Sequence, residues 1–143
     1  MNTSPESPMD VVETYFEAVA NNDIDAITSV ITEDFTQFPP PAGVRQDRDE
    51  FIAEWRQRIE DDPTSALKYE RAHSVTERIK SGPREGEWIH EWGTYRRTDG
   101  LLTFKLNASF RITEGKVSEI HAFFDRLDVM TQAGFTLAPP QVG

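Results

Sequence analysis

The sequence predicts an α+β fold in which N-terminal helices pack on one face of a curved, mostly antiparallel sheet. Two observations support this prediction. Apolar residues recur at helical spacing from Met9 to Ala20 and from Phe51 to Ile59. After Pro63 the period changes to two, which is typical of strands with one buried face. Because helices come first and a four-strand meander follows, we expect a cone-shaped α+β barrel with a cavity beneath the helices.

Length and composition are those of one domain. The chain of 143 residues suffices for a single core, which we expect from about residue 8 to 135, with loose termini. A net charge of −10 argues against nucleic acid and against an anionic membrane surface as partners. The absence of cysteine excludes disulfides and thiolate chemistry. No apolar stretch nears the roughly 20 residues that span a bilayer, and the start lacks a signal-peptide pattern, so we expect a cytoplasmic protein.

Capping residues predict where the helices begin. Ser7 with Asp10 has the spacing of a capping box, and so has Asp47 with Glu50. Asp23 is placed to cap a second, shorter helix. We therefore expect three helices before the sheet.

Alternating segments predict the strands. One long strand is expected from Leu67 to Ile79, the next from Glu87 to Arg97, and a β-hairpin from Leu101 to Phe124. A shorter strand from Phe35 to Phe38 comes earlier and ends at Pro39, where a proline run cannot continue a ladder.

The hairpin also predicts which side chains face the core. A three-residue turn at 113–115 places Ala122 opposite Leu106 and turns both toward the core, whereas His121 and Asp125 face outward. Asp125 then stands where the N-cap of a final short helix belongs. We therefore interpret Asp125 as a capping residue and not as an acid of a site.

Three segments combine with this order of elements into a wider pattern. They are Thr32-Glu33-Asp34-Phe35, the turn from Phe110 to Lys116, and Phe123-Phe124-Asp125 before a helical tail. Together they resemble the SnoaL-like and limonene-epoxide-hydrolase-like branch of the nuclear transport factor 2 superfamily, over about Met9 to Phe135. The resemblance implies a cone-shaped pocket and a homodimer. Because the superfamily includes isomerases, cyclases, hydrolases, dehydratases and non-catalytic modules, it does not decide the activity.

The catalytic residues of that branch have poor counterparts here. The resemblance implies an acid/base aspartate on the last strand, where this chain has Ala122. The arginine and second aspartate of the hydrolases would fall between Ile89 and Trp92, which contains neither. The water-holding tyrosine would fall at Gln37. The sequence therefore does not support the epoxide-hydrolase mechanism.

Polar residues on apolar faces are the alternative candidates. His90 lies between Trp88 and Trp92, and His73 shares the apolar face of Tyr69. A buried polar group is costly unless it is partnered, so these positions need an explanation. We hypothesise that His90 is a general acid/base in the cavity, because histidine titrates near neutral pH. The alternative is that both histidines form hydrogen bonds to neighbours and fill the core.

Arg71 is the second catalytic candidate, because it lies on the same predicted face as Tyr69. It could hold a carboxylate or enolate oxygen of a substrate. The alternative is a salt bridge to Glu77 or Glu91. The remaining candidates are polar or aromatic side chains that could line a pocket for a small apolar ligand. These substrate-binding candidates are Gln37, Trp55, Tyr69, His73, Trp92 and Phe104.

Neither a metal nor a cofactor is expected. The histidines come from three strands, and no HxH or HExxH spacing occurs. The chain also has no glycine-rich phosphate loop and no dinucleotide fingerprint.

Two functions remain open from the sequence. One is a cofactor-independent isomerase, cyclase or dehydratase that acts by proton transfer on a small apolar organic molecule. The other is a ligand-binding or dimerisation module of the same fold without catalysis. An open cavity on which His90 and Arg71 converge would favour the enzyme.

Overall fold

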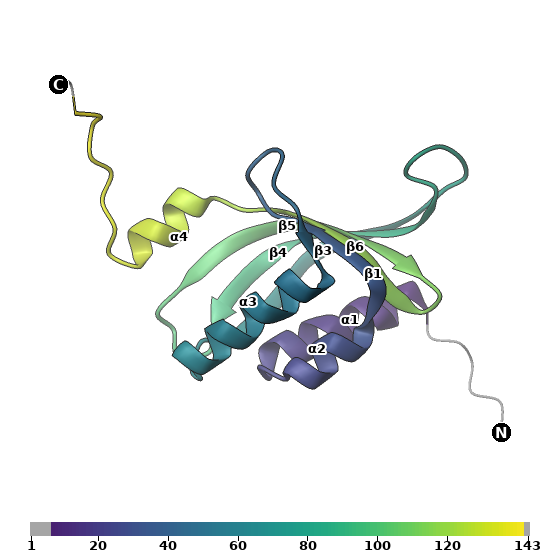
Figure 1. Ribbon diagram of the computed structural model, residues 1–143, viewed down its shortest axis with the longest axis horizontal. Helices are drawn as coiled ribbons and strands as arrows, with labels where there is room; N and C mark the ends of the chain where they lie inside the picture. The colour runs from purple at the N-terminus through teal and green to yellow at the C-terminus, as the bar shows by residue number, and fades with distance from the viewer. Residues whose placement is uncertain (1–6, 142–143) are drawn as a thin grey trace.

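The computed structural model describes residues 7–141 and shows a curved sheet with helices on its concave side (Figure 1). Residues 1–6 and 142–143, which include most of the predicted loose termini, lie outside the described part. The helices are α1 (Pro8–Ala20), α2 (Ile24–Val30), α3 (Arg48–Asp61) and α4 (Arg126–Gln132). The strands are β1 (Ile31–Phe38), β2 (Gln46–Asp47), β3 (Leu67–Ile79), β4 (Gly86–Arg97), β5 (Thr103–Thr113) and β6 (Lys116–Phe123). The predicted α+β fold is confirmed.

All predicted caps are present. The side chain of Ser7 accepts a hydrogen bond from the backbone N–H of Asp10, and the same reciprocal box joins Asp47 to Glu50. Asp125 caps α4. Each cap satisfies a backbone donor that the helix leaves unpaired, which stabilises the fold by about 1 kcal/mol. Local sequence therefore determines where these helices begin.

The sheet is mixed, with the strand order β2-β1-β6-β5-β4-β3. Strands β3 to β6 form the predicted antiparallel meander, and β1 adds to its edge by running parallel to β6. The two-residue strand β2 pairs with β1 and was not predicted. Helix α1 packs mainly against β3, and α3 lies beside β1. Among the described residues no helix is long and apolar enough to cross a membrane.

The β5–β6 turn is tighter than the sequence analysis expected. Thr113 pairs with Lys116, so only Glu114 and Gly115 form the loop. Both have positive φ, at 52° and 75°, as a two-residue turn that matches the twist of the flanking strands requires. Ser118 is then an extra residue in β6, because the register shifts between the pairs on either side of it.

This bulge corrects the predicted register. Ala122 pairs with Ala108 and not with Leu106, which lies two residues further along the same face of β5. Because the difference is two residues, the predicted facing of Ala122 toward the interior is nevertheless confirmed.

A second bulge, at Ala72 of β3, overturns a prediction. Arg71 pairs with Gly93, but His73 already pairs with Trp92, so one residue is skipped. Tyr69 and Arg71 therefore face the helices, whereas His73 lies on the outer face of the sheet. The expectation that Arg71 and His73 share one face is wrong for this reason.

Gly93 allows close packing between β3 and β4. The ring of Tyr69 stacks on that of Phe16 in α1 at 4.0 Å between centroids. A Cβ atom at Gly93 would lie only 2.6 Å from the Tyr69 ring and would also clash with the carbonyl oxygen of Glu70. The absence of a side chain at this position thus allows the aromatic stack to form.

We predict that Gly93→Ala lowers the free energy of unfolding by about 1–3 kcal/mol, the usual cost of overpacking. Urea denaturation measures this change. Thr94→Ala is the matched control, because Thr94 is the next residue of β4 and faces the other side; it should change stability by less than about 0.5 kcal/mol. Equal stability of the two variants would contradict the packing argument.

Candidate functional site

A cavity of about 530 Å³ opens between α3, the concave face of the sheet, the loop after β1 and helix α4. Most of its lining is aliphatic or aromatic. The lining residues are Tyr15, Gln37, Pro39, Pro40, Pro41, Val44, Gln46, Phe51, Glu54, Trp55, Arg58, Leu67, Tyr95, Phe104, Leu106, Ala108, Phe110, Ile120, Ala122, Phe124, Arg126, Val129 and Met130. This size and composition are typical of a pocket for a small organic molecule.

Helix α3 contributes two aromatic and two charged side chains to the cavity. Phe51, Glu54, Trp55 and Arg58 follow one another at helical spacing and therefore share one face. The guanidinium carbon of Arg58 lies 4.5 Å from the centroid of the Trp55 ring. Burial lowers the pKa of Arg58 from its ordinary value, although the group stays charged at neutral pH. Within residues 7–141, no carboxylate lies within ion-pair distance of this guanidinium.

Two buried phenols lie near Arg58. Tyr15 comes from α1 and Tyr95 from β4, and their exposed fractions are 5% and 9%. Burial raises the pKa of both hydroxyls well above the ordinary value, so both stay protonated at neutral pH. Neither hydroxyl forms a hydrogen bond to another side chain of the described chain. Both are therefore available as neutral hydrogen-bond donors.

Glu54 is the only carboxylate among the described residues that line the cavity. It accepts a hydrogen bond from the side-chain amide of Gln46 in β2. On β1, the side-chain amide oxygen (Oε1) of Gln37 is buried and has no hydrogen-bond partner among residues 7–141. The cavity thus contains one acid, two arginines without an ion-pair partner among residues 7–141, the half-buried Arg58 and the exposed Arg126, and several free hydrogen-bonding groups.

The predicted substrate-binding residues lie in three different places. Gln37, Trp55 and Phe104 line the cavity. Tyr69 lies beneath α1, stacked on Phe16. His73 and Trp92 stack on each other at 4.5 Å on the outer face of the sheet, so neither reaches the cavity.

The predicted orientation of His90 is wrong, because its side chain lies on the outer face of β4. Nδ1 lies 2.7 Å from Oγ of Ser109 on β5, and Nε2 lies 3.0 Å from a carboxylate oxygen of Glu77 on β3. On β4 the helix-facing positions are Ile89 and Glu91, both fully buried. The flanking tryptophans suggested a core face, but they lie on the outer side with His90.

Arg71 forms an ion pair and does not line the cavity. Its Nε lies 2.5 and 2.9 Å from the two carboxylate oxygens of Glu91, and Nη1 contacts Glu13 of α1. These hydrogen bonds, the one to Glu91 above all, raise the pKa of Arg71. The predicted alternative of a salt bridge to Glu91 is confirmed. Because Glu91 is completely buried, Arg71 neutralises a charge that the core could not otherwise hold.

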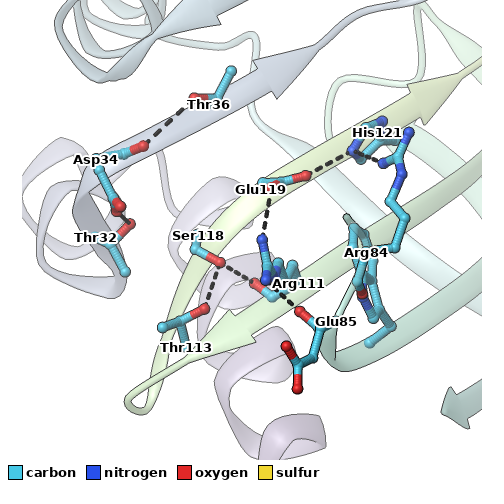
Figure 2. A network of polar contacts seen from close by, with 11 residues as sticks. Thr32, Asp34, Thr36, Arg84, Glu85, Arg111, Thr113, Ser118, Glu119 and His121 are labelled. Atoms are coloured by element: carbon cyan, nitrogen blue, oxygen red, sulfur yellow. Dashed lines mark hydrogen bonds and ion pairs between the residues drawn. The ribbon is translucent and has the colours of Figure 1, made fainter. Parts of the chain in front are cut away.

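The outer face of the sheet contains a separate polar network, shown in Figure 2. His121 lies 3.0 Å from both Arg84 and Glu119, and Arg111 donates to the same glutamate. His121 thus faces outward as predicted. Across residues 7–141, no group of three or more histidine or acidic side chains could hold a metal ion.

The comparison with family models decides the family. The model of the SnoaL-like domain matches residues 12–120, about three quarters of the chain. The protein is a member of the SnoaL-like family. Its resemblance to this family, inferred from short segments, is thereby confirmed. No curated protein is significantly similar to the chain.

Solved structures similar to this SnoaL-like protein share its nuclear transport factor 2-like fold. An NTF2-like protein of unknown function from Cytophaga hutchinsonii aligns over 91% of this chain and 99% of its own, with 15% identity and a TM-score of 0.67. IdmH of Streptomyces antibioticus, a proposed polyketide cyclase, aligns over 91% of this chain and 100% of its own, with 16% identity and a TM-score of 0.68. A proposed SnoaL-like polyketide cyclase from Shewanella putrefaciens aligns over 93% of this chain and 96% of its own, with 12% identity and a TM-score of 0.67. At such identities the likeness extends to the fold alone.

Sequence reasoning missed four of the polar cavity residues. Tyr15 follows Glu13 and Thr14, and Tyr95 lies between Thr94 and Arg96, so neither has a local pattern that marks it as a cavity residue. Glu54 lies three positions after the buried Phe51, and Arg58 lies three positions after the buried Trp55. This was a usable signal, because residues three or four positions apart share a helix face.

We predict that Glu91→Gln lowers the free energy of unfolding by about 1–3 kcal/mol, because Arg71 loses its charged hydrogen-bond partner. Glu13→Gln removes the exposed partner of the same arginine and should cost less than about 1 kcal/mol. Denaturant titration of both variants measures the difference. A larger loss for Glu13→Gln than for Glu91→Gln would contradict the conclusion that the buried pair contributes more to stability.

Proposed function

We propose that this SnoaL-like protein binds a small, largely apolar organic molecule in the cavity and moves a proton on it with its own side chains. The observation that supports this most directly is that Glu54, Tyr15 and Tyr95 all line one largely apolar cavity. A cavity of about 530 Å³ has room for such a molecule. The aromatic rings of Trp55 and Phe104 provide flat surfaces against which the molecule can pack.

The polar groups suit proton abstraction next to a carbonyl group. Glu54 is placed to take the proton from carbon, and the electron pair of the broken C–H bond then moves to the carbonyl oxygen. The protonated hydroxyls of Tyr15 and Tyr95 can donate to that oxygen as its negative charge develops. Return of the proton to another atom completes an isomerisation, and the same first step serves a cyclisation or a dehydration.

A second function is favoured by one specific observation. Ala122 lines the cavity at the place where the resemblance implies an acid/base aspartate. A chain that has lost this acid could retain the cavity as a binding module without catalysis. The two functions share the ligand site and differ only in the role of Glu54.

We predict that the wild-type chain accelerates exchange of the α-hydrogens of 2-tetralone, a neutral bicyclic ketone, with D₂O. Glu54→Gln should reduce this acceleration by roughly 100-fold or more, the usual contribution of a general base. Proton NMR follows the exchange. Glu60→Gln, at an exposed position of the same helix, is the matched control and should leave the rate unchanged. Binding of 2-tetralone without any acceleration would contradict catalysis and leave the binding module.

We also propose that the chain forms a homodimer through the outer face of the sheet. Phe123 and Val75 are exposed there, at 59% and 46%, and the half-buried Trp92 lies on the same face. Association would remove this apolar surface from water.

We predict a dimer by size-exclusion chromatography with light scattering, and a monomer for Phe123→Glu, which places a charge on the outer face. Leu101→Glu is the control, because Leu101 is exposed in the β4–β5 turn, away from this face. A strictly monomeric wild-type chain would rule out the homodimer.

A further inference from the structure

We infer that the ligand is an organic acid, whose carboxylate is held by Arg58 while its flat apolar body fills the cavity. This inference rests on the proposed function, because it assigns the chemical class of the molecule in the same cavity. It starts from Arg58, which is a half-buried cation on the cavity wall without an anionic partner among residues 7–141.

Three other partly buried arginines of the described chain show what Arg58 lacks, whereas Arg48 donates to the backbone carbonyl of Thr28 and lies away from the cavity lining. Arg71 pairs with Glu91, Arg97 with Asp62 at 2.8 Å, and Arg111 with Glu119 at 3.0 Å. Charged groups removed from water are normally paired, because the loss of hydration is costly. Arg58 differs from Arg48 in that it lines the cavity, from which an anionic partner can approach it.

The surroundings of Arg58 favour an anion and not a neutral group. Glu54, the one nearby carboxylate of the lining, is engaged by Gln46 and forms no ion pair with the guanidinium. Tyr15 and Tyr95 are neutral donors, and the charge of Arg58 acts on both phenols. A carboxylate would therefore meet the cation of Arg58, and the two phenols stay available for a carbonyl oxygen of the same molecule. Hydrogen bonds from the guanidinium are stronger when the acceptor is charged.

Trp55 orients the guanidinium. The Cζ atom of Arg58 lies over the indole ring at 4.5 Å, which limits the positions that the planar group can adopt. A guanidinium held in this way can present an edge with two N–H groups to both oxygens of one carboxylate. Lysine could not reproduce this planar geometry.

The cavity wall formed by the sheet indicates the chemistry of the rest of the ligand. Phe104, Leu106, Phe110 and Ile120 project from β5 and β6 into the cavity, and none of them offers a polar atom. The body of the ligand therefore has to be apolar. The net charge of −10 repels anions in general, so a preference for an acid has to come from this local site.

The test uses 2-naphthoate and its neutral counterpart 2-naphthamide as probes, titrated by isothermal calorimetry into the full chain. Wild-type protein should bind 2-naphthoate at least about tenfold more tightly than 2-naphthamide, as expected for charged hydrogen bonds. Arg58→Gln should abolish this preference and leave the affinity for 2-naphthamide unchanged. Arg58→Lys retains the charge without the planar group, and it should lose part of the preference.

Arg56→Gln is the matched control. Arg56 is an exposed residue of the same helix, and its substitution removes one positive charge, as Arg58→Gln does. It should retain the full preference. Equal affinity of wild-type protein for both probes would overturn the inference but leave the cavity as a binding site. A preference that survives Arg58→Gln and disappears in Arg126→Gln would assign the anion to the cavity mouth instead. Failure of both probes to bind would contradict the proposed function itself.

Discussion

Two β-bulges decide which side chains of this sheet point into the cavity. Along a regular strand, facing alternates with every residue, so one extra residue exchanges the two faces beyond it. The bulge at Ala72 leaves Arg71 under the helices and moves His73 to the outside. The bulge at Ser118 keeps both Val117 and Ala122 on the inner face. The composition of the cavity therefore depends on two local irregularities of the backbone.

The concave side of the sheet has two parts with different chemistry. Under α1, the Glu91–Arg71 pair and the stack of Tyr69 on Phe16 are packed tightly and leave no room for a ligand. Under α3, a cavity lined by Tyr95, Phe104, Leu106 and other side chains of the sheet remains open. Charges in the first part are neutralised within the chain. In the second part Arg58 stays unpaired, and for this reason we place the ligand there.

Much of the fold was predictable because its signals are local. Capping boxes at Ser7 and Asp47, the N-cap at Asp125 and the hairpin around Gly115 act over three or four residues. The candidate site was harder to predict. His90 was assigned to the interior because tryptophans flank it, yet an aromatic residue can be covered on either face of a sheet. Periodicity indicates that the two faces of a strand differ in polarity, but the packing of the helices decides which face is buried.

The sequence by itself determined the helices, the meander and the family, because caps, turns and alternation are properties of short segments. Tertiary structure alone decided the parallel pairing of β1 with β6, the two bulges and the meeting of Tyr15, Arg58 and Tyr95 in one cavity. These three residues come from α1, α3 and β4, far apart in the chain. Their proximity results from packing between distant elements, and no short-range pattern in the sequence encodes it.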